Sequence, residues 1–146
     1  AKREDTRLIA VVMGTRSEEA RARETQKLFG YGFRYFETHK LYSAGDTLQT
    51  QAVWLGMQDS VNLTLENDLY LTLPRGSKGE LQVEMSTNDY PEAPIAAGAQ
   101  LGKLTIRMED EVVAELPLIA AANVDEASFF GRFIGRIKLF FTRLLG

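Results

Sequence analysis

Few residues of this sequence have the types and spacing that catalysis or metal binding requires. The single histidine, His39, has no second histidine with which to form a metal pair, and we expect it at the surface of a linker. The stretches ENDLY (66–70) and MEDE (108–111) offer oxygen ligands that suit calcium, but neither has EF-hand spacing. Both stretches are typical of solvated turns.

Other candidate ligand sites have simpler structural interpretations. PRGSKG (74–79) has two glycines and two cations, but it lacks the GxxxxGK[ST] spacing of a phosphate-binding loop, and we predict a hairpin turn. Trp54, Tyr70 and Tyr90 can stack on a sugar or peptide, yet aromatic residues in alternating strands more often form core or cross-strand pairs. The sequence contains no cysteine, which excludes disulfides and thiolate zinc sites. We predict no metal and no cofactor.

The C-terminal segment SFFGRFIGRIKLFFTRLLG (128–146) is suited to binding a lipid surface. It has ten large apolar residues, four basic residues and no acidic residue. At about 100° per residue, all the large apolar residues except Leu139 fall on an arc of about 160°, with the cations at its margins. The predicted membrane-binding residues are Phe129, Phe130, Phe133, Ile134, Ile137, Phe140, Phe141 and Leu144, with Arg132, Arg136, Lys138 and Arg143.

Four cations in one short segment would be costly inside a bilayer, so we expect this helix to lie in the plane of the membrane surface. Each cation near an anionic leaflet contributes about 1 kcal/mol. The alternative is a terminal helix that docks on its own β domain or on a partner helix. The phenylalanine-rich arc, the lack of acidic residues and a hinge-like AANVDEA segment (121–127) favour the membrane.

The charge of the chain is divided unevenly. Residues 1–126 carry 13 basic and 20 acidic side chains, a net charge of −7, whereas residues 127–146 carry +4. The acidic body argues against nucleic-acid binding. No signal peptide is visible, which favours either a cytoplasmic protein or a chain whose true N-terminus is missing.

Two kinds of sequence pattern predict the elements that position these residues: a strand followed by a helix near the N-terminus, and alternating strands after it. TRLIAVVMG (6–14) predicts a strand covered on both faces, and the capping-box spacing of Thr15 and Glu18 introduces a helix over 16–36. One strand and one helix cannot form a layered domain, so this part is either the end of a domain that begins elsewhere or an addition to the later β structure.

From about residue 38 the pattern alternates with period two. The runs 46–56, 60–66, 68–74, 78–86, 101–109 and 111–120 predict six strands, with a tight hairpin at EDE (109–111). They predict a mainly β chain with a small antiparallel sandwich or barrel. The expected divisions are 1–37, 38–122 and 123–146.

Six strings occur in an order that resembles a known family: RLIAVVMG, ETQKLFGYGFRYFET, VWLG, YLTLPRG, APIAAGAQLGKL and ELPLIAAANVDEASFFGR. They resemble the C-terminal half of serine D-alanyl-D-alanine carboxypeptidases, the low-molecular-mass penicillin-binding proteins. The resemblance implies that 1–37 is the strand–helix remnant of an α/β, β-lactamase-like penicillin-binding domain. Residues 38–122 would be the β-rich domain that holds the active site off the membrane. Residues 123–146 would be the anchor on the periplasmic face of the bacterial inner membrane.

The same resemblance implies an activity and partners. The family removes the terminal D-alanine of peptidoglycan pentapeptides through an acyl-serine intermediate. The implied partners are an anionic phospholipid surface, peptidoglycan through the catalytic domain, and a cell-wall protein at the β domain, with no nucleic acid.

The family's catalytic motifs are missing from this chain. K-[ST]-G is absent, and no serine has lysine three positions later, as S-x-x-K requires. We therefore expect no catalytic residue here. The alternative function is a stand-alone, non-catalytic β domain that binds a protein or glycan at a membrane surface.

Overall fold

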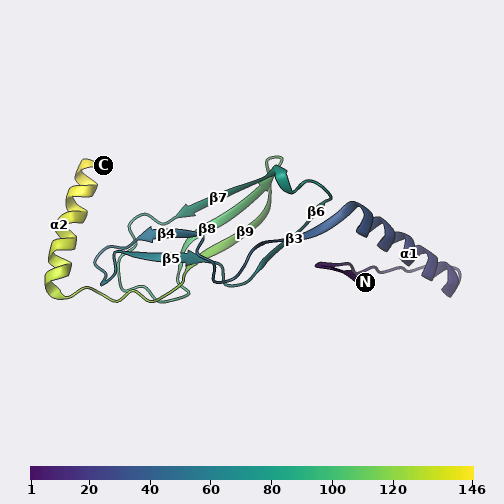
Figure 1. Ribbon diagram of the computed structural model, residues 1–146, viewed down its shortest axis with the longest axis horizontal. Helices are drawn as coiled ribbons and strands as arrows, with labels where there is room; N and C mark the ends of the chain where they lie inside the picture. The colour runs from purple at the N-terminus through teal and green to yellow at the C-terminus, as the bar shows by residue number, and fades with distance from the viewer. The chain divides into compact units, whose positions relative to one another are not determined.

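The computed structural model describes the backbone of residues 1–146 and every side chain except those of residues 129, 131 and 132. The chain divides into two compact units, whose helices and strands are labelled in Figure 1. The first consists of Ala1–Leu41 and Leu69–Leu81, and the second of Tyr42–Asp68 and Gln82–Gly146. The predicted fold class is confirmed, because the chain is mainly β and ends in a helix.

The first unit is built around one long helix. Its elements are β1 (Lys2–Arg3), β2 (Thr6–Arg7), α1 (Glu18–Tyr35), β3 (Phe36–Tyr42), β6 (Leu69–Pro74) and the 3₁₀ helix η1 (Lys78–Glu80). Strand β1 pairs with β2, and β3 pairs with β6. The predicted helix is confirmed as α1, but its cap is Ser17 rather than Thr15. The Ser17 hydroxyl accepts a hydrogen bond from the Ala20 N–H at 3.1 Å, satisfying one free donor of the first turn.

The strand predicted over 6–14 is found only at its start. Thr6 and Arg7 pair with β1, whereas residues 8–14 form no strand and Ile9, Val11 and Met13 are exposed. A strand needs a neighbouring backbone to satisfy its N–H and C=O groups. Among the described residues only β1 pairs with this segment. The prediction of a strand covered on both faces is therefore wrong for residues 8–14.

Strand β3 differs from the prediction, which places His39 in a linker. Phe36–Tyr42 follows α1 directly and pairs with β6, and the hydroxyls of Thr38 and Thr72 lie 2.7 Å apart across the two strands. The sequence FETHKLY shows no clean alternation of apolar and polar residues, and that alternation is the signal that identifies the other strands.

The second unit contains a five-stranded sheet. Its elements are β4 (Gln49–Ala52), β5 (Ser60–Thr64), β7 (Leu81–Thr87), β8 (Gln100–Met108), β9 (Glu111–Ala120) and the helix α2 (Phe129–Leu145). The strand order is β4-β5-β9-β8-β7, and the pairs β4–β5, β5–β9 and β8–β9 are antiparallel. The largest fully buried side chains form its core: Leu63, Leu65, Leu104, Ile106 and Leu118. These five strands, together with β6 of the first unit, correspond to the six predicted strands.

Two predicted hairpins have different outcomes. Strands β8 and β9 are joined through Glu109 and Asp110, whose φ angles of 49° and 69° fit a type I′ turn, so the hairpin at 109–111 is confirmed. The hairpin predicted at 74–79 is wrong, because β6 pairs with β3 and β7 lies next to β8. That turn connects two different sheets.

Candidate functional site

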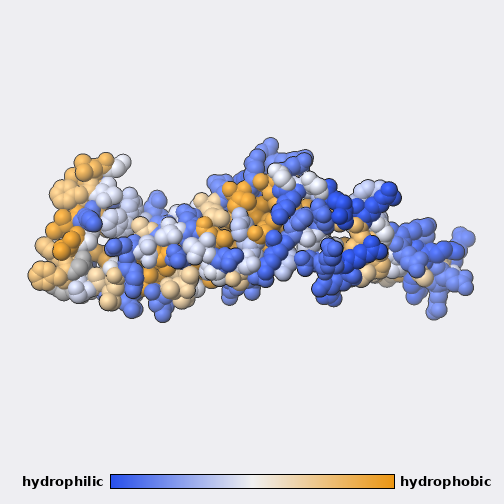
Figure 2. Space-filling model, in the orientation of Figure 1, coloured by the Kyte–Doolittle hydropathy of each residue, from blue (hydrophilic) through white to orange (hydrophobic). Residues whose placement is uncertain are grey.

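Helix α2 exposes most of the residues that the sequence selects for membrane binding. The described apolar residues of the arc are between 45% and 83% exposed: Phe130, Phe133, Ile134, Ile137, Phe140, Phe141, Leu144 and Leu145. Arg136, Lys138 and Arg143 are also exposed. Figure 2 shows hydrophobic side chains along α2, at the left of the view. Phe129 and Arg132, which are also predicted, lie outside the described side chains.

The length and composition of α2 bear on how it can meet a bilayer. None of the helices among the described residues is both long enough and apolar enough to cross a membrane.

The face of α2 opposite the arc packs on its own β domain, which we define as residues 42–68 and 82–127. Leu139, the apolar residue outside the arc, is only 7% exposed. At Gly135 the helix backbone lies against Leu55, since a Cβ at this glycine would stand 2.8 Å from Leu55 Cδ2. Gly135 and Leu139 are four residues apart and so share one face of the helix. The two alternatives weighed from the sequence are therefore compatible, because α2 docks by one face and exposes the other.

A pair of aromatic rings in the β domain also lies next to α2. The Arg143 guanidinium lies 5.9 Å from the ring centroid of Tyr90, within cation–π range, and the Tyr90 ring lies 5.8 Å from that of Trp54. Trp54 and Tyr90 thus form a ring pair next to α2, whereas Tyr70 belongs to the first unit and lies near Lys40.

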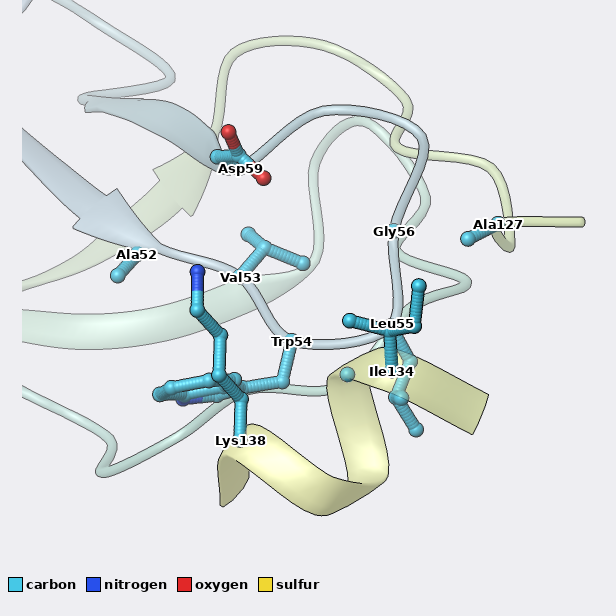
Figure 3. Close-up of a pocket in the computed structure, with 10 residues that line it drawn as sticks. Ala52, Val53, Trp54, Leu55, Gly56, Asp59, Ala127, Ile134 and Lys138 are labelled. Atoms are coloured by element: carbon cyan, nitrogen blue, oxygen red, sulfur yellow. The ribbon is translucent and has the colours of Figure 1, made fainter. Parts of the chain in front are cut away.

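A cavity of about 460 Å³ lies between α2 and the loop that follows β4. Helix α2 contributes Ile134, Gly135 and Lys138 to its wall, and the β domain contributes Trp54 and Asp59 among others (Figure 3). The Lys138 side chain extends away from the helix towards the β domain (Figure 3). This cation therefore stands at the edge between the docked face and the exposed arc.

The segment before α2 is held by backbone hydrogen bonds. Ile95 and Val124 exchange two bonds of 2.8 Å, and the N–H of Ala127 donates to the carbonyl of Leu55 at 2.8 Å. Val124 is 2% exposed. The hinge predicted at 121–127 is therefore wrong for 124–127, and Ser128 is the one residue between Ala127 and the start of α2.

Arg75 forms a second polar cluster, in the first unit. Its guanidinium donates to the carbonyls of Phe33 at 2.9 Å and Arg34 at 3.2 Å, and its backbone N–H donates to Tyr35 at 2.8 Å. These carbonyls end α1 and have no partner within the helix. The sequence gives no sign of this role, because Arg75 lies about forty positions from the helix that it caps.

Glu37 joins the same cluster. Its carboxylate accepts a hydrogen bond from the Gly76 N–H at 3.0 Å and lies 3.1 Å from His39 Nε2. The Gly76 hydrogen bond, followed by the interactions with His39 and Arg75, lowers the pKa of Glu37 below its ordinary value of 4.5. His39 is thus placed beside a carboxylate in strand β3.

The acidic stretches form turns. Asp68 accepts a hydrogen bond from the Ala44 N–H at 2.7 Å, and Glu109 and Asp110 form the β8–β9 turn. Within the part of the chain that the structure describes, no group of three or more His, Asp or Glu side chains is placed to hold a metal ion.

Comparisons with known proteins agree on one family. The family described as penicillin-binding protein 5, C-terminal domain, matches residues 36–126. D-alanyl-D-alanine carboxypeptidase DacA of Escherichia coli K12 is 33% identical over 141 residues, which are 96% of this chain and 35% of that protein. DacC of the same strain is 34% identical over 143 residues, or 97% of this chain and 36% of that protein.

A solved structure shows the same similarity. Penicillin-binding protein 5 from Haemophilus influenzae matches with a TM-score of 0.73 and 31% identity, over 79% of this chain and 34% of that one. The chain thus spans about a third of the length of these relatives.

Proposed function

Since the chain belongs to the family of penicillin-binding protein 5 C-terminal domains, we propose that it is the scaffold and membrane-anchoring part of a D-alanyl-D-alanine carboxypeptidase. In this proposal the whole protein removes the terminal D-alanine of peptidoglycan pentapeptides through an acyl-serine intermediate. The S-x-x-K and K-[ST]-G motifs do not occur in this chain. We therefore assign the reaction to the part of the relatives that the chain does not span.

The exposed arc of α2 is the observation that carries the anchoring proposal. Its four described phenylalanines are all more than half exposed. Moving each into the acyl region would contribute about 1 to 2 kcal/mol, given that a fully buried Phe contributes about 1.5–3 kcal/mol. Each bordering cation near an anionic leaflet adds about 1 kcal/mol. The apolar contribution therefore exceeds the electrostatic one, and high salt should weaken binding without abolishing it.

The proposed location follows from this anchor. We place α2 on the periplasmic face of the bacterial inner membrane, with its apolar arc among acyl chains and the cations at the margins of the arc level with the anionic headgroups. The β domain then stands between the membrane and the catalytic part of the protein. A cell-wall protein bound to the β domain and peptidoglycan bound to the catalytic domain complete the proposed set of partners.

Vesicle sedimentation tests the anchor. Replacing Phe133, Ile137 and Phe140 with Ser should leave the protein in the supernatant when phosphatidylglycerol vesicles are pelleted, whereas the unmodified chain should pellet with them. Because all three residues are exposed, circular dichroism should show the β domain still folded.

A matched control separates membrane binding from general hydrophobicity. Replacing Ile9, Val11 and Met13 with Ser removes a similar exposed apolar area outside α2 and should leave sedimentation unchanged. If the α2 variant pelleted as well as the unmodified chain, the anchor proposal would be rejected.

A further inference from the structure

We infer that α2 binds the membrane while it stays docked on the β domain, so that the β domain is held in one orientation on the lipid surface. Gly135 and Leu139 are the residues that fix this orientation. The inference rests on the proposed membrane anchoring. It adds that the anchor is a rigid mount rather than a flexible tether.

The two faces of α2 point in opposite directions. At about 100° per residue, the centre of the apolar arc lies about 180° from the midpoint between Gly135 and Leu139. Docking through these two residues therefore leaves every described residue of the arc at least 45% exposed, although Ile134 at the arc's edge also lines the cavity. The helix does not have to leave the β domain in order to present its apolar face.

Two separate contacts fix the direction of the helix axis. Gly135 lies against Leu55, and Arg143 lies over the ring of Tyr90. These positions are eight residues apart, which corresponds to about 12 Å along an α-helix. One contact would allow the helix to pivot, but two contacts at this separation restrain it.

The entry to the helix adds a third restraint. The bond from the Ala127 N–H to the Leu55 carbonyl joins the preceding segment to the same loop that Gly135 contacts. Gly56 supports this loop, because a Cβ there would stand 2.7 Å from Val124 Cγ1. Only Ser128 separates the hydrogen-bonded Ala127 from α2, so the helix has little freedom to move away from the β domain.

The docked geometry predicts where the rest of the β domain lies. Helix α2 is at one end of the five-stranded sheet, and the β8–β9 turn is at the other end (Figure 1). Strand β9 alone has ten residues, which span roughly 30 Å at about 3.3 Å per residue. With the arc on the membrane, Glu111 at the start of β9 should therefore stand well above the lipid surface.

The test uses the whole chain and two optical readouts. Trp54 is the single tryptophan and lies beside the docked helix, so its emission reports docking without vesicles. The chain has no cysteine, so Glu111→Cys gives one fluorophore site at the far end of the sheet. Energy transfer from this site to acceptors in phosphatidylglycerol vesicles reports its height above the membrane.

Two variants should undock the helix. Gly135→Leu places a side chain where Leu55 lies but raises helix propensity, and Leu139→Ser removes the buried contact. Both should shift Trp54 emission to the red in solution and still pellet with vesicles. Both should raise the mean efficiency of energy transfer from residue 111 and widen the distribution of donor–acceptor distances, because a flexibly tethered β domain can tilt towards the lipid. The matched control Leu144→Ser, at an exposed leucine of the same helix, should lose part of the vesicle affinity but keep the Trp54 emission and the energy transfer of each bound molecule.

The outcomes separate the two proposals. Unchanged Trp54 emission and energy transfer in Gly135→Leu and Leu139→Ser, with vesicle binding intact, would overturn the rigid mount alone. Failure of the unmodified chain to pellet would overturn the proposed anchor, and with it the mount on a membrane, whatever the emission of Trp54 shows.

Discussion

At the scale of single residues, Arg75 and Glu37 hold the end of α1 and the start of β3 together. Arg75 caps the last carbonyls of the helix, and Glu37 accepts from the turn that carries Arg75. Hydrogen bonds to charged groups are among the stronger ones in proteins. Periodicity cannot find such a pair, because the partners are 38 positions apart. Gly135 is similar, since a helical wheel places it outside the arc but does not reveal Leu55 opposite.

Glu37 gives a prediction about pH. Its pKa is lowered in the folded protein, so it contributes stability that is present above pH 4.5 and is lost as the pH falls through the lowered pKa. In urea unfolding, Glu37→Gln should be less stable than the unmodified chain at pH 7, and the difference should shrink at pH below about 4.5. The matched control Glu84→Gln, at an exposed carboxylate of β7, should show little difference at either pH. A Glu37→Gln effect that does not change with pH would contradict this assignment.

At the scale of elements, the periodicity of apolar residues predicts most of the strands and the terminal helix. Alternating runs identify β4–β9, and the apolar arc identifies α2. Two segments differ from the sequence-based prediction, each for a physical reason. Residues 8–14 have the composition of a buried strand, but strand formation also needs a partner backbone. Strand β3 has the partner, β6, but not the pattern, because its side chains do not divide cleanly into an apolar and a polar face.

The β-domain core gives a prediction about stability. Leu104 lies in β8 with no exposed surface, so Leu104→Ala removes buried methyl groups and leaves a cavity. We expect it to lower the free energy of unfolding by about 2–5 kcal/mol in a urea titration. Val83→Ala, at an exposed position of β7, should change it by less than about 0.5 kcal/mol. Equal effects at the two positions would contradict the assignment of the core.

At the scale of the whole molecule, the chain combines an acidic β-rich body with a basic, apolar terminal helix. Composition alone reveals this division, and it is the basis for proposing a lipid surface as a partner. The docking of α2 depends on a glycine, a leucine and a short hydrogen-bonded segment whose partners lie in distant loops. The sequence therefore predicts which face of α2 is apolar, but the structure is needed to show that the opposite face is fixed to the β domain.

The carboxypeptidase proposal can be tested directly by the intact mass of the native protein, measured with and without a fluorescent penicillin. An antibody against this chain would recover the native protein from cell membranes. We predict a protein roughly three times as heavy as the 16.3 kDa chain, since the chain spans 35% of DacA, and one covalent label per molecule. A native mass near 16.3 kDa without a label would contradict the carboxypeptidase proposal and favour a stand-alone β domain at the membrane surface.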